Sequence, residues 1–72
     1  MINNIIKVGV IGLGVGEAHI KSYKKIKNVE VLAICDLNTK RLKEIKKKYN
    51  IPYAYTNSKK ITENKEINLV SI

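Results

Sequence analysis

The fold is decided by the stretch Val10-Ile11-Gly12-Leu13-Gly14-Val15-Gly16-Glu17-Ala18-His19. Its three alternating glycines come directly after an aliphatic run, residues 5–11, and directly before a segment with helical spacing. A nearly continuous aliphatic run is typical of a parallel strand that is covered on both faces. Glycines between a strand and a helix are typical of a turn that brings backbone N–H groups to a phosphate. The stretch therefore predicts a strand, a glycine turn at residues 12–16 and a helix, with a candidate phosphate site at the turn.

The glycine spacing departs by one residue from the G-x-G-x-x-G pattern of dinucleotide sites. Gly12 would permit the tight exit from the strand, and Gly14 would let the backbone approach a pyrophosphate closely. The third glycine arrives early, so either Gly16 provides close packing of helix on strand or Ala18 does so in a differently wound turn. Glu17 would repel a pyrophosphate, and we expect its carboxylate to point away. The alternative is a tight turn that binds no ligand.

An acidic residue, Asp36, ends the second predicted strand 24 residues after Gly12. At about this spacing a carboxylate can accept hydrogen bonds from both adenosine ribose hydroxyls, and its charge opposes a 2′-phosphate. NAD is therefore predicted in preference to NADP. Two alternatives stay open: Asp36 could merely begin the turn that leads to Asn38, and Lys40 or Arg41 could reach a 2′-phosphate. The predicted cofactor-binding residues are Gly12, Leu13, Gly14, Val15, Gly16, Asp36 and Leu37.

Two helices are predicted from spacing and capping signals. The first has apolar residues at every third position, Ile20, Tyr23 and Ile26. The second has one apolar face, Leu42, Ile45 and Tyr49. Asn38 is a suitable N-cap for the second helix. Asn50 can adopt the left-handed conformation that ends it, and Pro52 prevents its simple continuation.

Strands are predicted at residues 5–11, 29–35, 53–55 and 67–72, and a brief helical turn at residues 59–63 has Asn57 or Ser58 as its cap. Connections of this length join parallel strands by right-handed crossovers. The sequence therefore predicts an α/β chain, a Rossmann-like βαβαβαβ half-fold whose parallel sheet has the order 3-2-1-4. Because the chain stops inside the fourth predicted strand, we expect a truncated N-terminal piece of a larger domain.

Length and composition limit the classes of protein. The chain has 72 residues, too few for a two-domain enzyme, and its 44% hydrophobic and 28% charged residues are ordinary for a globular protein. The net charge of +8 allows a nucleic-acid surface, but Arg41 is the one arginine among 14 basic residues, and arginine is preferred for specific phosphate and base contacts. We expect a solvated lysine surface, no specific nucleic-acid partner and no membrane partner. The single cysteine, Cys35, excludes an internal disulfide and favours the cytoplasm.

The remaining chemically active residues predict no catalytic or metal site. One histidine and one cysteine are too few for a structural zinc site. His19 is interpreted as structural, although it could contact a substrate or the loop backbone. Cys35 lies inside an apolar strand and is interpreted as a packing residue.

Several segments together resemble a known family: residues 9–14, the Gly16-Glu17-Ala18-His19 segment, the strand that ends in Cys35-Asp36, residues 53–56 and the final strand. They resemble the N-terminus of the Gfo/Idh/MocA family, which includes glucose-fructose oxidoreductase and inositol dehydrogenase. The resemblance implies an NAD(P)-dependent oxidoreductase of sugars, cyclitols or related polyols. It also implies that an A-T-P segment, a catalytic E-K-P lysine and a catalytic histidine follow residue 72. We therefore expect residues 1–72 to be a partial NAD(P)-binding domain that is inactive alone and has no substrate domain.

Two other function classes remain as alternatives. The glycines of residues 12–16 also resemble the first motif of S-adenosylmethionine-dependent methyltransferases, although Val10 stands where that motif usually has an acidic residue. A non-catalytic nucleotide-binding or interaction module would need only the half-fold and the lysine surface. In any of these classes, an unpaired edge of the fourth strand is expected to promote self-association.

Overall fold

The computed structural model describes residues 4–72, so the first three residues of the predicted 1–72 unit lie outside the described part. Strands and helices alternate along the chain as β1 (Ile6–Ile11), α1 (Leu13–Lys24), β2 (Val29–Cys35), α2 (Thr39–Tyr49), β3 (Tyr53–Tyr55), α3 (Lys59–Thr62) and β4 (Leu69–Ser71). Every strand pairing is parallel, and the sheet order is β3-β2-β1-β4. The predicted fold class and strand order are confirmed.

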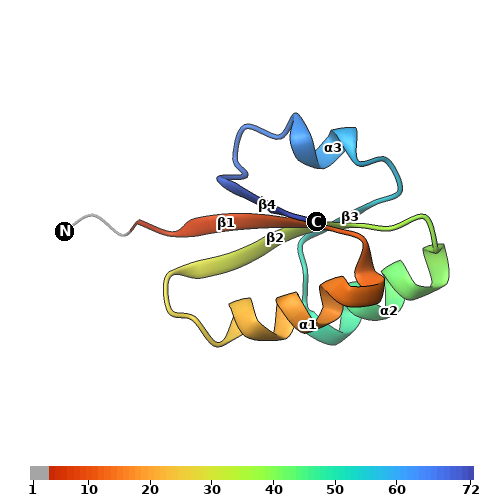
Figure 1. Ribbon diagram of the computed structural model, residues 1–72, viewed down its shortest axis with the longest axis horizontal. Coiled ribbons are helices and arrows are strands. Elements are labelled where there is room, and N and C mark those ends of the chain that lie inside the picture. The colour runs from red at the N-terminus through yellow and green to blue at the C-terminus, as the bar shows by residue number, and fades with distance from the viewer. Residues whose placement is uncertain (1–3) are drawn as a thin grey trace.

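The helices form a layer on each face of the sheet. Figure 1 shows the sheet nearly edge-on, with α1 and α2 on one face and α3 on the other. The α1/α2 face has the larger buried cluster, which includes Val10, Ile20 and Ile34. The α3 face has a smaller cluster around Ala33, Cys35 and Ile61. Alternation along β1 and β2 sends successive side chains to the two clusters, which explains why these strands are aliphatic on both faces.

Gly9 in β1 allows α3 to lie directly on the sheet. A Cβ atom at this position would stand 2.5 Å from Cγ2 of Ile61 and 3.0 Å from Cδ1 of Ile67. Ile61 is fully buried and has no room to withdraw. The absent side chain therefore creates the space that the α3 layer fills.

The first helix is shorter than its apolar spacing suggests. Ile20 is buried and Tyr23 is partly buried, as predicted, but α1 ends at Lys24 and Ile26 is 52% exposed. The backbone N–H of Ile26 donates to the carbonyl of Tyr23, three residues earlier, which tightens the chain as it leaves the helix. The prediction that Ile26 lies on the same side of the helix as Ile20 and Tyr23 is therefore wrong, because α1 ends two residues before it.

Both predicted caps of α2 are confirmed. The Asn38 side chain accepts a hydrogen bond of 3.1 Å from the backbone N–H of Arg41. Asn50 has φ 57° and ψ 49°, the left-handed conformation that ends a helix. For α3, Ser58 occupies the N-cap position, while the side chain that accepts a bond from Lys59 N–H is that of Asn57, at 2.9 Å.

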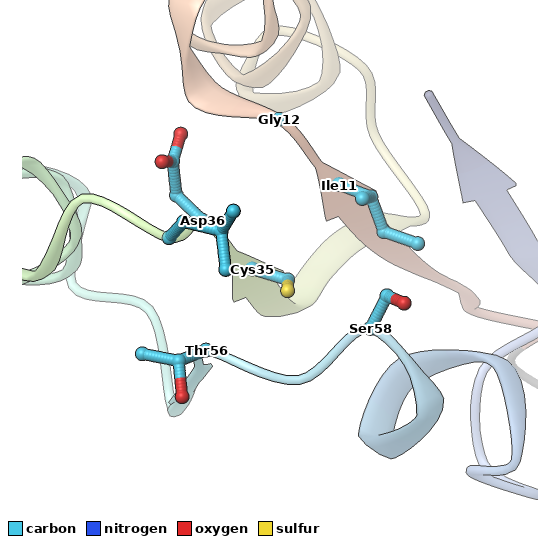
Figure 2. A pocket seen from close by; sticks show the side chains of 7 residues that line it. Ile11, Gly12, Cys35, Asp36, Thr56 and Ser58 are labelled. Atoms are coloured by element: carbon cyan, nitrogen blue, oxygen red, sulfur yellow. The ribbon is translucent and has the colours of Figure 1, made fainter.

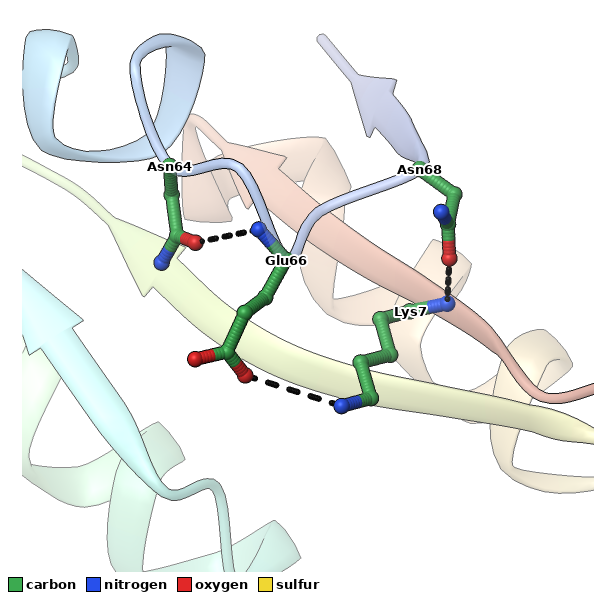
Figure 3. Close-up of polar contacts among 4 residues, drawn as sticks. All are labelled: Lys7, Asn64, Glu66 and Asn68. Atoms are coloured by element: carbon green, nitrogen blue, oxygen red, sulfur yellow. Dashed lines mark hydrogen bonds and ion pairs between the residues drawn. The ribbon is translucent and has the colours of Figure 1, made fainter.

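The fourth strand begins two residues later than predicted. Figure 3 shows the reason: the backbone N–H of Lys7 donates to the side-chain oxygen of Asn68, at 2.9 Å, instead of to a strand carbonyl. Regular pairing with β1 starts only at Leu69. The approach to β4 is further fixed by the Asn64 side chain, which accepts from Glu66 N–H, and by a Glu66–Lys7 ion pair of 3.5 Å. At the start of the predicted strand the Asn68 N–H still donates to the Lys7 carbonyl, at 2.8 Å, but side chains supply the other hydrogen bonds.

Candidate functional site

The candidate site lies where β1, β2 and β3 end. Gly12 follows β1, Asp36 follows β2 and Thr56 follows β3, so the three parallel strands bring these residues to one edge of the sheet. A pocket of about 370 Å³ opens there. Its lining residues are Ile11, Gly12, Cys35, Asp36, Leu37, Thr56 and Ser58 (Figure 2). Ligands of open α/β sheets bind outside the carboxyl ends of the strands, and this pocket has that position.

Gly12 has the backbone geometry that requires a glycine. Its φ of 85° is a conformation that residues with side chains rarely adopt, and a Cβ atom here would meet nothing within 4 Å. The Gly12 N–H donates to the carbonyl of Cys35 at 2.9 Å, which joins the ends of β1 and β2. The backbone is therefore open on the side that a ligand would approach.

Asp36 connects the two strand ends through its carboxylate. Oδ2 accepts a hydrogen bond of 2.7 Å from the N–H of Leu13, the first residue of α1. Oδ1 accepts one of 2.8 Å from Asn38 N–H. The turn contact that we considered as an alternative is thus present. Each oxygen still has acceptor capacity, because a carboxylate oxygen can accept two bonds. The predicted contact with ribose hydroxyls stays a prediction.

The glycines after Gly12 lie in the helix and not in a loop, which corrects the predicted turn of residues 12–16. The helix begins at Leu13, because Asp36 caps its first N–H and Gly16 N–H donates to the Gly12 carbonyl at 3.1 Å. A Cβ at Gly16 would stand 2.9 Å from Cγ1 of Val10. Gly16 therefore provides the close packing of helix on strand, and Ala18 is not needed for it.

The second glycine faces a cation. A Cβ at Gly14 would have Arg41 Nη1 as its neighbour, at 3.6 Å. The guanidinium group belongs to the first turn of α2 and also lies close enough to Asp36 to favour its ionised form. Positive charge thus stands beside the start of α1, where the helix dipole already favours an anion.

The other predicted site residues have different side-chain environments. The Leu13 side chain is 1% exposed and packs in the core, so it offers a ligand only its backbone. Val15 is 74% exposed and Leu37 is 86% exposed. Leu37 borders the pocket and presents apolar surface to it.

Glu17 is held away from the pocket, as predicted. Its Oε2 accepts hydrogen bonds from Lys48 Nζ at 2.9 Å and from the Tyr49 hydroxyl at 2.8 Å, both in the last turn of α2. Because α2 begins beside Asp36, its last turn is the end remote from the pocket. The bonds from Lys48 and Tyr49 also hold the pKa of Glu17 below its ordinary value. The charge of Glu17 is thus neutralised by α2.

Cys35 lies in the core, and His19 contacts the last residue of β4. Cys35 is buried and burial raises the pKa of its thiol, so the interpretation as a packing residue is confirmed. Nδ1 of His19 lies 2.9 Å from the Ser71 hydroxyl, which links α1 to β4. Among residues 4–72 there is no group of histidine, cysteine and acidic side chains that could hold a metal ion.

Sequence reasoning missed Thr56 and Ser58. Both line the pocket and offer hydroxyl groups from the segment between β3 and α3. The signal was present, because Thr56 directly follows a predicted strand and the carboxyl ends of parallel strands meet at one edge.

In the described part of the chain, no helix is long and apolar enough to cross a membrane.

Acid is expected to weaken the fold through Asp36. The backbone N–H groups of Asn38 and Leu13 hold the pKa of this carboxyl below its ordinary value of 3.8. A carboxyl with a lowered folded-state pKa stabilises the fold fully above its unfolded value, and the stabilisation is lost as pH falls through the folded-state pKa. As pH falls from above 3.8 through the lowered folded-state pKa, urea unfolding of wild type should lose more free energy than that of Asp36→Asn. Equal acid sensitivity of the two proteins would contradict this assignment.

Comparison with protein families and with curated proteins relates the chain to oxidoreductases in both cases. Residues 6–72 match the profile described as an oxidoreductase family with an NAD-binding Rossmann fold. Myo-inositol 2-dehydrogenase from Thermotoga maritima is 33% identical over 67 residues. That alignment covers 92% of this chain and 20% of the relative, so the chain spans about a fifth of the length of the curated protein it matches.

Solved structures support the same relationship. A probable dehydrogenase from Thermotoga maritima superimposes with a TM-score of 0.87 at 33% identity, over 90% of this chain and 20% of that one. Myo-inositol dehydrogenase from Lactobacillus casei, solved with NAD(H) and myo-inositol, gives 0.81 at 26% identity, over 94% and 22% of the two chains. Because the family profile matches residues 6–72, nearly the whole chain, the chain belongs to the Gfo/Idh/MocA family of oxidoreductases with an NAD-binding Rossmann fold.

Proposed function

We propose that this chain is the dinucleotide-binding part of an NAD(P)-dependent oxidoreductase that acts on a sugar, cyclitol or related polyol. The observation that carries the proposal is the meeting of Gly12, Asp36 and the pocket at the carboxyl ends of three parallel strands. Residues 1–72 would form a partial NAD(P)-binding domain, and the residues that select and oxidise a substrate would lie outside it. The free, buried Cys35 supports a cytoplasmic location.

The described residues fit a dinucleotide. Gly12 and the first turn of α1 would face the diphosphate, because the space above Gly12 is open and a helix N-terminus favours an anion. The Asp36 carboxylate would accept from the ribose hydroxyls, and Leu37 would cover apolar surface of the adenosine. When bound, the nicotinamide ring supplies hydride acceptance and donation, and this chain binds and orients the cofactor.

NAD is proposed as the cofactor in preference to NADP. The Asp36 carboxylate is held ionised by its two backbone donors and by the nearby Arg41, and a 2′-phosphate would meet this negative charge. Arg41 is the group that would reduce the repulsion. The balance between these two side chains therefore determines the cofactor preference.

A cyclitol is the favoured substrate class. One relative is named myo-inositol 2-dehydrogenase, and another was solved with myo-inositol and NAD(H). The 72-residue chain alone is expected to bind NAD without reducing it in the presence of myo-inositol, as followed by NADH absorbance. NADH formation by the chain alone would contradict its role as the binding part.

Calorimetric titration of the chain with NAD, NADP and S-adenosylmethionine tests the proposal. We expect NAD to bind about tenfold more tightly than NADP, because two like charges about 4 Å apart repel by roughly 1–4 kcal/mol and about 1.4 kcal/mol corresponds to tenfold. No heat of binding is expected for S-adenosylmethionine. Binding of S-adenosylmethionine with none of either dinucleotide would overturn the proposal.

Self-association is proposed to occur through β4. In residues 4–72 the outer side of this strand pairs with no other strand, and Leu69 and Ile72 beside it are 45% and 92% exposed. An unpaired apolar edge is a template for pairing with a second copy. Sedimentation velocity should show dimers or larger species that decrease in Leu69→Lys, whereas the exposed Val15→Lys should not change them. A stable monomer at high concentration would contradict this expectation.

A further inference from the structure

The strand order reverses at β1: β2 and β3 lie on one side of β1, and β4 lies on the other side. From β1 the chain passes through α1 to β2 on one side, whereas α3 precedes β4 on the other side and covers the opposite face (Figure 1). Ligands of such sheets bind in the crevice at this switch point. The pocket described above is lined from β1, β2 and the segment after β3, and none of its lining residues belongs to β4. A ligand with two nucleotides would therefore extend from this pocket past β1 toward the end of β4.

β4 is a short strand at the edge of the sheet. Only Leu69, Val70 and Ser71 pair with β1. Val70 packs with the cluster on the α3 face, but on the other face the side chain of Leu69 is 45% exposed. On that face, in the described part of the chain, one side-chain hydrogen bond joins β4 to α1: His19 Nδ1 to the Ser71 hydroxyl, at 2.9 Å.

This bond connects α1 to the last residue of β4. Ser71 is the last residue of β4 and pairs with Val10, which is two residues before Gly12. His19 lies on α1, whose N-terminus begins directly after Gly12. Both side chains are partly buried, so the contact is partly shielded from water. A shift of the β4 end relative to α1 would therefore change the distance between the end of β4 and the segment that starts at Gly12.

We propose that His19 is a positioning residue that, through Ser71, holds the carboxyl end of β4 in place for the second nucleotide of a dinucleotide. The inference rests on the proposed NAD-binding function. It predicts that the two halves of the ligand depend on different contacts. Binding of the adenosine half depends on the pocket at Asp36, and binding of the nicotinamide half depends on the His19–Ser71 contact. A purely structural role would affect both halves equally or neither.

The test compares NADH with AMP, which has only the adenosine half. Ser71→Ala and His19→Ala remove the contact, while Ser71→Thr keeps a hydroxyl and His19→Asn keeps a polar group near the Nδ1 position. In the alanine variants we expect NADH binding to weaken about fivefold and AMP binding to stay within about twofold. The two conservative variants should approach wild-type affinity for both ligands. Equal weakening of NADH and AMP, or no weakening of either, would overturn the proposal.

Backbone amide exchange without ligand gives a second, independent result. The amides of β4 should exchange faster in the alanine variants, and those of β3, such as Ala54, should not change. Faster exchange at all strands would mean a general loss of stability and would overturn the positioning role, as would unchanged exchange at β4. If the wild-type chain binds NADH no more tightly than AMP, the nicotinamide half adds no affinity and the proposed function is contradicted. The two failures are therefore distinguishable.

Discussion

Asp36→Ala is expected to lower the affinity for NAD by about 100-fold, because hydrogen bonds to a charged group are worth roughly 1.5–3 kcal/mol each. Two effects add. The variant loses the carboxylate that would accept from the ribose hydroxyls, and it loses the acceptor that caps Leu13 N–H at the start of α1. Calorimetric titration with NAD measures the change, and circular dichroism verifies that the variant is folded.

Two variants that each remove one negative charge distinguish the effect of the Asp36 carboxylate on NAD affinity from the effect of net charge. Glu44→Gln removes one negative charge from an exposed position on α2 and should leave NAD affinity unchanged. Asp36→Asn keeps one side-chain oxygen, so its NAD affinity should fall less and NADP should be excluded less strongly. Adding Arg41→Ala to Asp36→Asn should reduce the NADP affinity again. An unchanged preference for NAD over NADP in Asp36→Asn would refute the ribose contact.

Gly9→Val is expected to destabilise the fold by about 3 kcal/mol, within the upper range for overpacked cores. The Cβ atom would stand 2.5 Å from a fully buried Ile61 side chain, so α3 must move away from β1. A domain of this size has a free energy of unfolding of about 4–11 kcal/mol, and such a loss would unfold a large part of the population on mild heating. Urea unfolding measures the difference.

Gly14→Ala is the matched control for Gly9→Val. Its Cβ would make only an ordinary contact, at 3.6 Å, with the flexible end of Arg41. Since alanine favours a helix by about 0.8–1 kcal/mol over glycine, stability should stay equal or rise. NAD affinity should nevertheless fall, because the added methyl group lies on the segment that would approach the diphosphate. Equal stability of Gly9→Val and wild type would contradict the packing argument.

Local patterns were sufficient to predict most of the fold. The aliphatic runs of β1 and β2 indicate strands buried on both faces, and parallel pairing with short crossovers leaves few strand orders. Asn38 caps the start of α2 and Asn50 caps its end, as predicted, because each cap depends on contacts within one turn of the helix. The position of Asp36 beside the glycine segment also follows from strand order alone.

Features that depend on contacts between distant residues could not be predicted. Asp36 caps α1 from 23 residues away, so the helix starts at Leu13 and includes two glycines that were assigned to a turn. Asn68 replaces a strand carbonyl opposite Lys7, which shortens β4. The His19–Ser71 bond spans 52 residues and has no local signal. In each case a side chain supplies a hydrogen bond that backbone periodicity does not reveal.

The most direct test of the account is a ¹⁵N-edited NMR titration of the wild-type chain with NAD. Binding at the carboxyl ends of the strands predicts that the largest amide shifts occur at Gly12, Leu13, Leu37 and Thr56. Amides in the last turn of α2, around Lys48, should not move. Shifts confined to that lysine-rich turn, or no shifts at a large molar excess of NAD, would contradict a dinucleotide site in this chain.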